Sequence, residues 1–284
     1  MRQFFLFSLL ALLSYPTLTA QNGRLRALEE LPKIKGTTTL IVLYPEDEVY
    51  NKTITRAIDL YWDFTEVKFV QVDELREYAF DTQYSMLVRN NSERFVQRVG
   101  RTDRIQSNHL ALYLCGKGDN MMNYTGKDAL TQWLFPDVMD TQAFQFKLIT
   151  IVQSMNNYLN FLDGNKLTEI NFERKLDEFT NKQAGELKEM TLYVHEKEVT
   201  EKVRDLEKLK KAYGFEVQLV DKEAISKAVF SQDAKVAILH LDPRLRTYYI
   251  LSAKGGRILL HQEVNERGHL KLKDFAAMAK QIKR

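Results

Sequence analysis

The alternation of apolar and polar residues along the chain predicts two similar series of strands and helices. Residues 191–221, TLYVHEKEVTEKVRDLEKLKKAYGFEVQLVD, have the pattern of a strand, a charged amphipathic helix and a second strand. Residues 39–73, TLIVLYPEDEVYNKTITRAIDLYWDFTEVKFVQVD, follow the same order. Both segments open on Thr-Leu and close on Val-Asp. The pattern therefore indicates two β-α-β units and favours an internal duplication.

Each series continues beyond its β-α-β unit in a comparable way. In the first series we expect strands at 38–44, 66–72 and 84–88, helices at 49–64 and 74–80, a hairpin of 109–115 with 120–124, and a closing helix in KDALTQWLF after Gly126. In the second series we expect a helix at 196–213, a short helix at 222–230, a strand at 235–241, a hairpin of 248–251 with 257–261, and a closing helix at 271–283. Lys-Gly occurs in both expected hairpin turns, which strengthens the comparison.

About fifty residues between the two series have a helical pattern of their own. Apolar residues recur at helical spacing from Thr141 to Leu162, and Gly164 stands where a helix would end. A second helix is expected at 168–180. We therefore expect these two helices to form an αα-hairpin. Its apolar stripe either packs in the core or forms a docking face for another protein.

These patterns predict an α/β protein of two similar β-α-β-α-β-hairpin-α lobes joined by a helical hairpin. The chain has 284 residues, of which 44% are hydrophobic and 28% charged, and this is enough for two lobes of roughly 100 residues each. The expected divisions are a signal peptide at 1–20, an N-terminal lead-in at 21–36, a first α/β lobe at 37–138, a helical connector at 139–186 and a second α/β lobe at 187–284.

The segment TYYILSAKGGRILLHQEV and the helix after it resemble the last hairpin and helix of thioredoxin-like domains. The resemblance covers about thirty-five residues and implies an alternative architecture of thioredoxin-like lobes. The paired active-site cysteines of that family are absent, and Arg246 stands where the family has a proline. The resemblance therefore implies the fold without the redox activity.

The first twenty residues, MRQFFLFSLLALLSYPTLTA, have the composition of a secretory signal peptide. Arg2 precedes an apolar run from Phe4 to Leu13, and small or polar residues precede Ala20. The run is too short to span a bilayer, although a membrane anchor is the alternative interpretation. We therefore expect cleavage near Ala20 and a periplasmic or secreted protein with no membrane span after cleavage.

Composition excludes several classes of site. Cys115 is the only cysteine, which excludes an intramolecular disulfide, a C-x-x-C redox pair and a multi-cysteine zinc site. Its neighbours Leu112, Tyr113 and Leu114 predict a buried thiol in a strand. A formal net charge of +3 gives no case for nucleic acid as a partner. No dinucleotide loop, P-loop, nucleophile elbow or H-E-x-x-H pair is present, so no cofactor is expected.

Two groups of residues remain as candidate sites. His195, Asp221 and His240 follow or end successive strands of the second series, where ligands of parallel α/β sheets collect. They form a candidate ligand site, or the centre of a hydrolase or metal-dependent enzyme, although Asp221 is equally explained as a helix cap.

Four arginines form the second group, and they lie within eleven residues of the first series: Arg94, Arg98, Arg101 and Arg104. If the segment were helical, Arg94, Arg98 and Arg101 would share a face. They could bind an anion or an acidic partner, or they could simply form a solvated surface.

The sequence favours an exported, non-catalytic binding or interaction protein. The expected partner is another envelope or extracellular protein, or a small ligand. The alternative is the enzyme centred on His195, Asp221 and His240.

Overall fold

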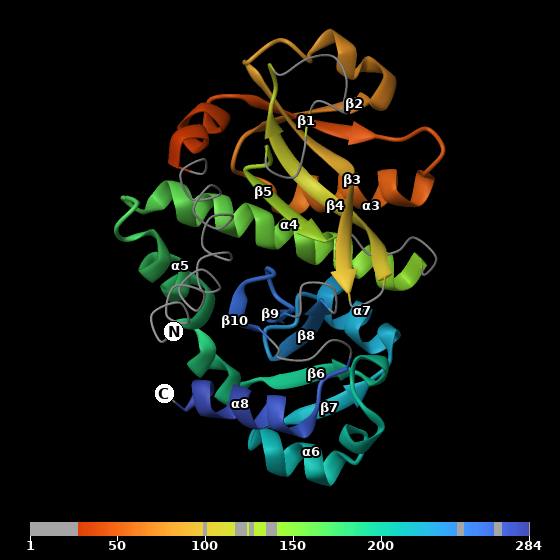
Figure 1. Cartoon of the computed structure of the whole chain (residues 1–284), viewed down its shortest axis with the longest axis vertical. Helices are drawn as coiled ribbons and strands as arrows, with labels where there is room; N and C mark the ends of the chain where they lie inside the picture. The colour runs from red at the N-terminus through yellow and green to blue at the C-terminus, as the bar shows by residue number, and fades with distance from the viewer. Residues whose placement is uncertain are drawn as a thin grey trace, which may run out of the picture. The chain divides into compact units, whose positions relative to one another are not determined.

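The computed structural model describes residues 28–98, 101–116, 124, 128–134, 141–242, 247–263 and 269–283 (Figure 1). The chain divides into two compact units. The first contains the described residues up to Leu43, Phe64–Trp133 and Leu162–Phe172, and the second contains Tyr44–Asp63, Leu134–Phe161 and the residues from Glu173 onwards. Each unit has a five-stranded mixed sheet, which confirms the α/β class. The expected signal peptide lies outside the described residues.

The sheet of the first unit has the strand order β2-β1-β3-β4-β5. Its strands are β1 (Thr38–Leu43), β2 (Glu66–Gln71), β3 (Tyr84–Arg98), β4 (Arg101–Leu114) and β5 (Thr131–Leu134). Strand β1 is parallel to β2 and to β3, and β3 is antiparallel to β4. A helix at 28–35 precedes β1 within the expected lead-in, and it buries Leu31 and Ile34. The short helix η1 (Val72–Glu77) follows β2.

Two expectations for the first series are wrong, namely the extent of the third strand and the closing helix, and a third falls mostly outside the described residues. Strand β3 extends to Arg98 and pairs with the whole of β4, so the hairpin is formed by β3 and β4. The expected hairpin partner at 120–124 lies almost entirely outside the described residues. The closing helix expected in KDALTQWLF is instead the strand β5, and the backbone N–H of Leu130 before it donates to the carbonyl of Leu112 at 2.8 Å. Pairing with β4 therefore overrides the local pattern.

The sheet of the second unit has the order β10-β9-β8-β6-β7. Its strands are β6 (Thr191–His195), β7 (Val217–Val220), β8 (Val236–Asp242), β9 (Thr247–Ser252) and β10 (Ile258–Glu263). Strand β6 is parallel to β7 and β8, while β9 is antiparallel to both of its neighbours. Counted in chain order, both sheets therefore have the arrangement 2-1-3-4-5.

Alternation along the second sheet separates its two faces. Leu192 and Val194 of β6 and Leu239 of β8 belong to a buried cluster that also contains side chains of α6 (Leu206–Tyr213) and α8 (Leu272–Ile282). The rings of Tyr213 and Phe275 meet edge to face at 6.4 Å between α6 and α8. Because side chains alternate along a strand, His195 and His240 lie on the opposite face from this cluster.

The helix expected at 196–213 is shorter than predicted. Residues 196–203 form two short turns, η4 (Glu196–Glu198) and η5 (Glu201–Val203), and Val199 bridges to Leu270. Backbone hydrogen bonds between Glu198 and Leu270 and between Thr200 and Leu270 hold this segment in place. Helix α6 then starts after Asp205, whose side chain caps it, and ends at Gly214 with φ +74°. The short helix α7 (Lys222–Phe230) matches its prediction.

Helix α4 (Thr141–Gly164) buries the apolar stripe seen in the sequence. Leu148, Ile151, Val152, Met155 and Leu159 are all at most 3% exposed. The stripe is therefore core, and the alternative of an exposed docking face on it is wrong for these residues.

Polar side chains of α4 attach it to two other parts of the second unit. Ser154 Oγ donates to the carbonyl of Gly256 and Asn157 Nδ2 to the carbonyl of Gly255, each at 2.7 Å, in the turn between β9 and β10. Asn156 Nδ2 donates to Asp63, just after α3 (Glu48–Tyr61), at 2.8 Å. The bond from Asn156, with a second from Asn160 Nδ2 at 2.7 Å, lowers the pKa of the Asp63 carboxyl.

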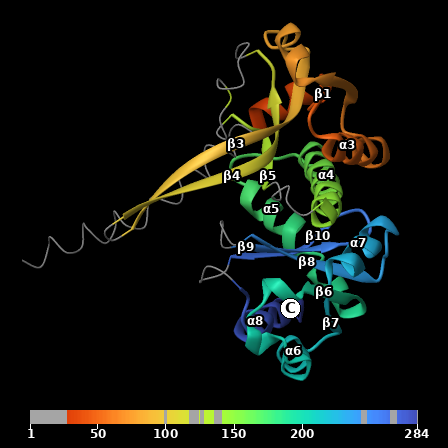
Figure 2. The same cartoon turned by 90° about the vertical axis from the view of Figure 1, so that its right-hand side faces the viewer.

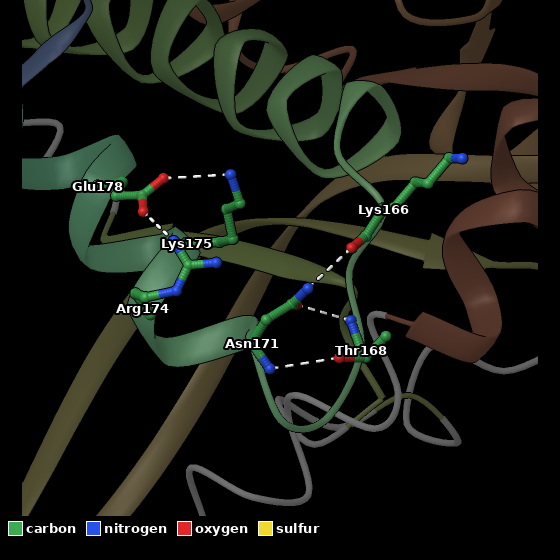
Figure 3. A network of polar contacts seen from close by, with 6 residues as sticks. All are labelled: Lys166, Thr168, Asn171, Arg174, Lys175 and Glu178. Carbon is green, nitrogen blue, oxygen red and sulfur yellow. Dashed lines mark hydrogen bonds and ion pairs between the residues drawn. The ribbon is translucent and has the colours of Figure 1, made fainter.

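Helix α5 (Phe172–Asn181) begins four residues later than expected. Before it, the backbone N–H of Thr168 donates to Asn171 Oδ1 at 2.8 Å, and the Asn171 N–H donates to Thr168 Oγ1 at 3.3 Å (Figure 3). This reciprocal turn satisfies backbone groups that a helix would otherwise use. The ring of Phe179 stacks on Phe161 of α4 at 4.5 Å, so the two helices contact each other as the helical pattern predicts. The short helix η3 (Ala184–Glu189) then leads into β6.

Candidate functional site

Two of the three candidate ligands come to one edge of the second sheet. The register of β6 with β8 runs from Thr191 opposite Val236 to Tyr193 opposite Ile238. His195 and His240 each lie two residues further along, so both reach the carboxyl ends of these parallel strands on the same face. This edge is where ligands bind in open α/β sheets.

Lys147 and Glu198 complete this group, which we call the strand-end cluster: Lys147, His195, Glu198 and His240. Lys147 extends from α4, and its Nζ lies 3.8 Å from Glu198 Oε1 in η4. Both side chains are largely buried, at 25% and 17% exposed. The second carboxylate oxygen of Glu198 is buried and has no hydrogen bond to any residue that the structure describes.

Burial decides the protonation of the strand-end cluster. It raises the pKa of Glu198 to about 7, against the opposing effects of Lys147 and of a hydrogen bond from the backbone of Leu241. Burial, with the charge of Lys147, lowers the pKa of His240 to about 3. Burial is also the main cause that lowers the pKa of His195, with Lys147 and Lys197 adding to it. Both imidazoles are therefore neutral at pH 7, while Glu198 is near its midpoint.

Asp221 does not join the two histidines as a ligand. Its side chain accepts a hydrogen bond from the backbone N–H of Ala224 at 2.8 Å and caps α7. The carboxylate affects His195 only through a weak electrostatic contribution. Throughout the described ranges, no group of three or more His, Cys, Asp or Glu residues is arranged to hold a metal ion.

Sequence reasoning missed Lys147 and Glu198. Lys147 is an isolated basic residue in a helix whose apolar spacing predicts core packing. Glu198 lies in a charge-rich stretch whose pattern predicts a solvated helix. The only sequence signal was Val199, an apolar residue that interrupts this charged run. The predicted burial of Cys115 is confirmed, although the residue lies just after the end of β4, and burial raises the pKa of its thiol to about 12.

The four arginines lie on two strands, so the helix considered for them is wrong. Arg94 and Arg98 belong to β3, and Arg101 and Arg104 belong to β4. In the register Arg98 is opposite Arg101, and Arg104 is opposite Phe95. The continuous pairing of fourteen residue positions sets this structure, and a search for helical spacing cannot detect pairing between strands.

The arginine-bearing part of the hairpin extends beyond the sheet (Figure 2). We call it the arm: Asn90–Arg98 of β3 and Arg101–His109 of β4. Strand β1 pairs with β3 only as far as Ile41 opposite Leu87. In the part of the chain that the structure describes, β4 is therefore the only strand paired with β3 along the arm.

Comparison of the chain with known protein families, curated proteins and solved structures gives no match. Of the helices in the described ranges, none combines the length and the apolar character needed to cross a membrane.

Proposed function

We propose that the protein is an exported, non-catalytic interaction protein of the cell envelope or extracellular space, and that the arm holds its partner. The arm carries this proposal. Its nine residue pairs extend about 30 Å at the usual rise of a strand. A two-stranded ribbon is only marginally stable by itself in water, because each strand has one neighbour and little core to cover it. A partner that covers the ribbon explains why so long a hairpin is present.

Export is supported by the sequence of the first twenty residues. The apolar run from Phe4 to Leu13 and the small residues before Ala20 fit a signal peptide. The single cysteine is compatible with an oxidising compartment, because the chain has no second thiol to mispair with Cys115. Mass spectrometry of the protein from its own cells tests this proposal, since a mature N-terminus near residue 21 is expected and an intact Met1 would contradict it.

An internal duplication is our proposal for the origin of the two lobes. It is supported by the common strand order and by the matching Thr-Leu and Val-Asp positions at the start and end of each β-α-β unit. The alternative, redox-inactive thioredoxin-like lobes, rests on the last hairpin and helix of the second lobe.

The second candidate function is a hydrolase centred on His195 and His240. It is favoured by two neutral imidazoles at the carboxyl ends of β6 and β8, both of which are affected by the charge of Lys147. The use of Asp221 as a helix cap weakens the original three-residue site. Turnover of p-nitrophenyl acetate by the wild type but not by His195→Ala would favour the hydrolase. Equal rates in both would contradict it.

An arm-shortened variant tests the interaction proposal. Asn90 is opposite His109, so replacement of residues 91–108 by Asn-Gly closes the hairpin at an existing pair with a suitable two-residue turn. Wild type and variant are used to capture proteins from the native cell envelope, and each captured protein is purified and titrated. We expect the specific partner to bind the variant at least tenfold more weakly. Equal affinity for both would overturn the role of the arm.

A further inference from the structure

We infer that the partner of the arm is an extended, acidic protein segment that adds as a strand beside β3. This inference rests on the proposed interaction function and specifies the chemistry of the partner. It has two independent supports, which are the edge of β3 that no described strand occupies and the charge of the arm.

The edge of β3 provides the backbone part of the recognition. Strand β1 occupies this edge as far as Leu87, and no other described strand continues along it from Asn90 to Arg98. In an antiparallel ribbon, alternate residues direct their N–H and C=O groups away from the paired strand. An added peptide strand satisfies these groups and extends the sheet in line with β1.

The charge of the arm selects the partner. It carries four arginines against two acidic residues, Glu93 and Asp103, so it holds most of the +3 formal charge of the entire chain. A strand rich in Glu or Asp would place opposite charges across the new pair, which is favourable. Charge on an edge strand also prevents unwanted pairing, so the same arginines make the edge selective.

A second copy of the chain fits this edge poorly. Antiparallel pairing of two β3 edges would bring the segment with Arg94 and Arg98 against the same segment of the other copy. Like charges that face each other across strands are destabilising. The arm is therefore better suited to a different, acidic chain than to self-association.

Nucleic acid is the other acidic polymer that a two-stranded ribbon can contact. Its affinity depends on the number of phosphates that are neutralised, and a net charge of about two on the arm neutralises few of them. Backbone pairing along an open edge is available only to a peptide. The observations therefore favour a protein segment.

The test uses full-length protein and fluorescein-labelled ten-residue peptides in anisotropy titrations. The main probe alternates Glu with Val. The first control has Lys in place of Glu, and the second keeps every side chain but is methylated at alternate backbone nitrogens. A random-sequence DNA duplex is the fourth probe. We expect the Glu-Val peptide to bind at least tenfold more tightly than all three of the others.

Protein variants separate the charge of the arm from the charge of the whole molecule. Arg94→Gln with Arg98→Gln is expected to weaken Glu-Val peptide binding at least fivefold. The matched control, Arg76→Gln with Arg204→Gln, removes the same charge at two exposed positions outside the arm and is expected to bind as the wild type does. Equal loss in both variants would indicate general electrostatic attraction and would overturn the inference.

Hydrogen exchange provides the readout of strand addition. Peptide binding should slow exchange of amides in β3 between Asn90 and Arg98 while leaving α8 unchanged. Tighter binding of DNA, equal binding of the methylated peptide, or no binding of any peptide would each contradict strand addition by an acidic segment. If the arm-shortened variant still loses its native partner in that case, the interaction function stands and only the inferred partner chemistry fails.

Discussion

The turn between β9 and β10 has two adjacent glycines that differ in the space around them. Gly255 and Gly256 both have positive φ, at +74° and +60°. A Cβ at Gly256 would lie 2.6 Å from Gln153 Cβ and 3.2 Å from the carbonyl oxygen of Thr150, whereas a Cβ at Gly255 would meet no atom within 4 Å. Alanine at each position therefore separates backbone strain from a clash with α4.

The expected losses follow from these two effects. An alanine in the left-handed region costs about 1–2 kcal/mol, and this cost applies to both variants. Overpacking in a close contact adds about 1–3 kcal/mol, and this applies only to Gly256→Ala. Displacement of the turn would also strain the hydrogen bond from Ser154 Oγ to the Gly256 carbonyl. We therefore expect Gly256→Ala to lower the free energy of unfolding by about 3 kcal/mol or more, and Gly255→Ala to lower it by about 1.5 kcal/mol.

Urea unfolding followed by circular dichroism measures both losses, with the slope m shared between the variants. Hydrogen exchange in β8 and β9 reports the second unit separately, since the two units need not unfold together. Gly256→Ala should shift the midpoint about twice as far as Gly255→Ala. Equal midpoints for the two variants would refute the close packing of α4 on this turn.

Three further predictions concern the strand-end cluster and the cap of α7. The pKa of Glu198 is raised to about 7, so the stability that this carboxyl contributes is present below about pH 4.5 and is lost as pH rises to 7. Urea titrations should therefore show that Glu198→Gln gains stability relative to wild type as pH rises from 4.5 to 8. The pKa of His240 is lowered to about 3, so the stability that this imidazole contributes is present above pH 6.5 and is lost as pH falls toward 3. His240→Gln should reduce the loss of stability between pH 6.5 and 3. An unchanged loss would count against the buried imidazole. Asp221→Ala should cost about 1 kcal/mol through the lost cap while Asp221→Asn retains stability, and a large loss in Asp221→Asn would instead indicate a need for the charge.

The sequence predicts those elements whose pattern is local. The span of α7 and the starts of β1 and β6 follow directly from apolar spacing and from caps such as Asp221. The same local reasoning fails where a distant segment decides the structure. Val199 leaves the helical pattern because it pairs with Leu270, seventy-one residues further along the chain. Neither residue alone carries a signal for that contact.

The strand-end cluster was predictable only in part, for a related reason. His195 and His240 could be found because the carboxyl ends of parallel strands are a general location for ligands. Lys147 reaches them from α4, and its position depends on how that helix packs, which apolar spacing alone does not specify. Asp221 was correctly weighed as a cap, because an Asp directly before a helix has that role in many proteins.

The common strand order also gives a reason to assign the arm to function. In the second sheet, the third and fourth strands are β8 and β9, which have seven and six residues. In the first sheet, the strands at the same places are β3 and β4, which have fifteen and fourteen residues. A five-stranded sheet of this order therefore needs only about half of the length of β3 and β4. The additional residues pair with each other beyond the sheet and carry the four arginines, which is why we propose binding, and not stability of the sheet, as their role.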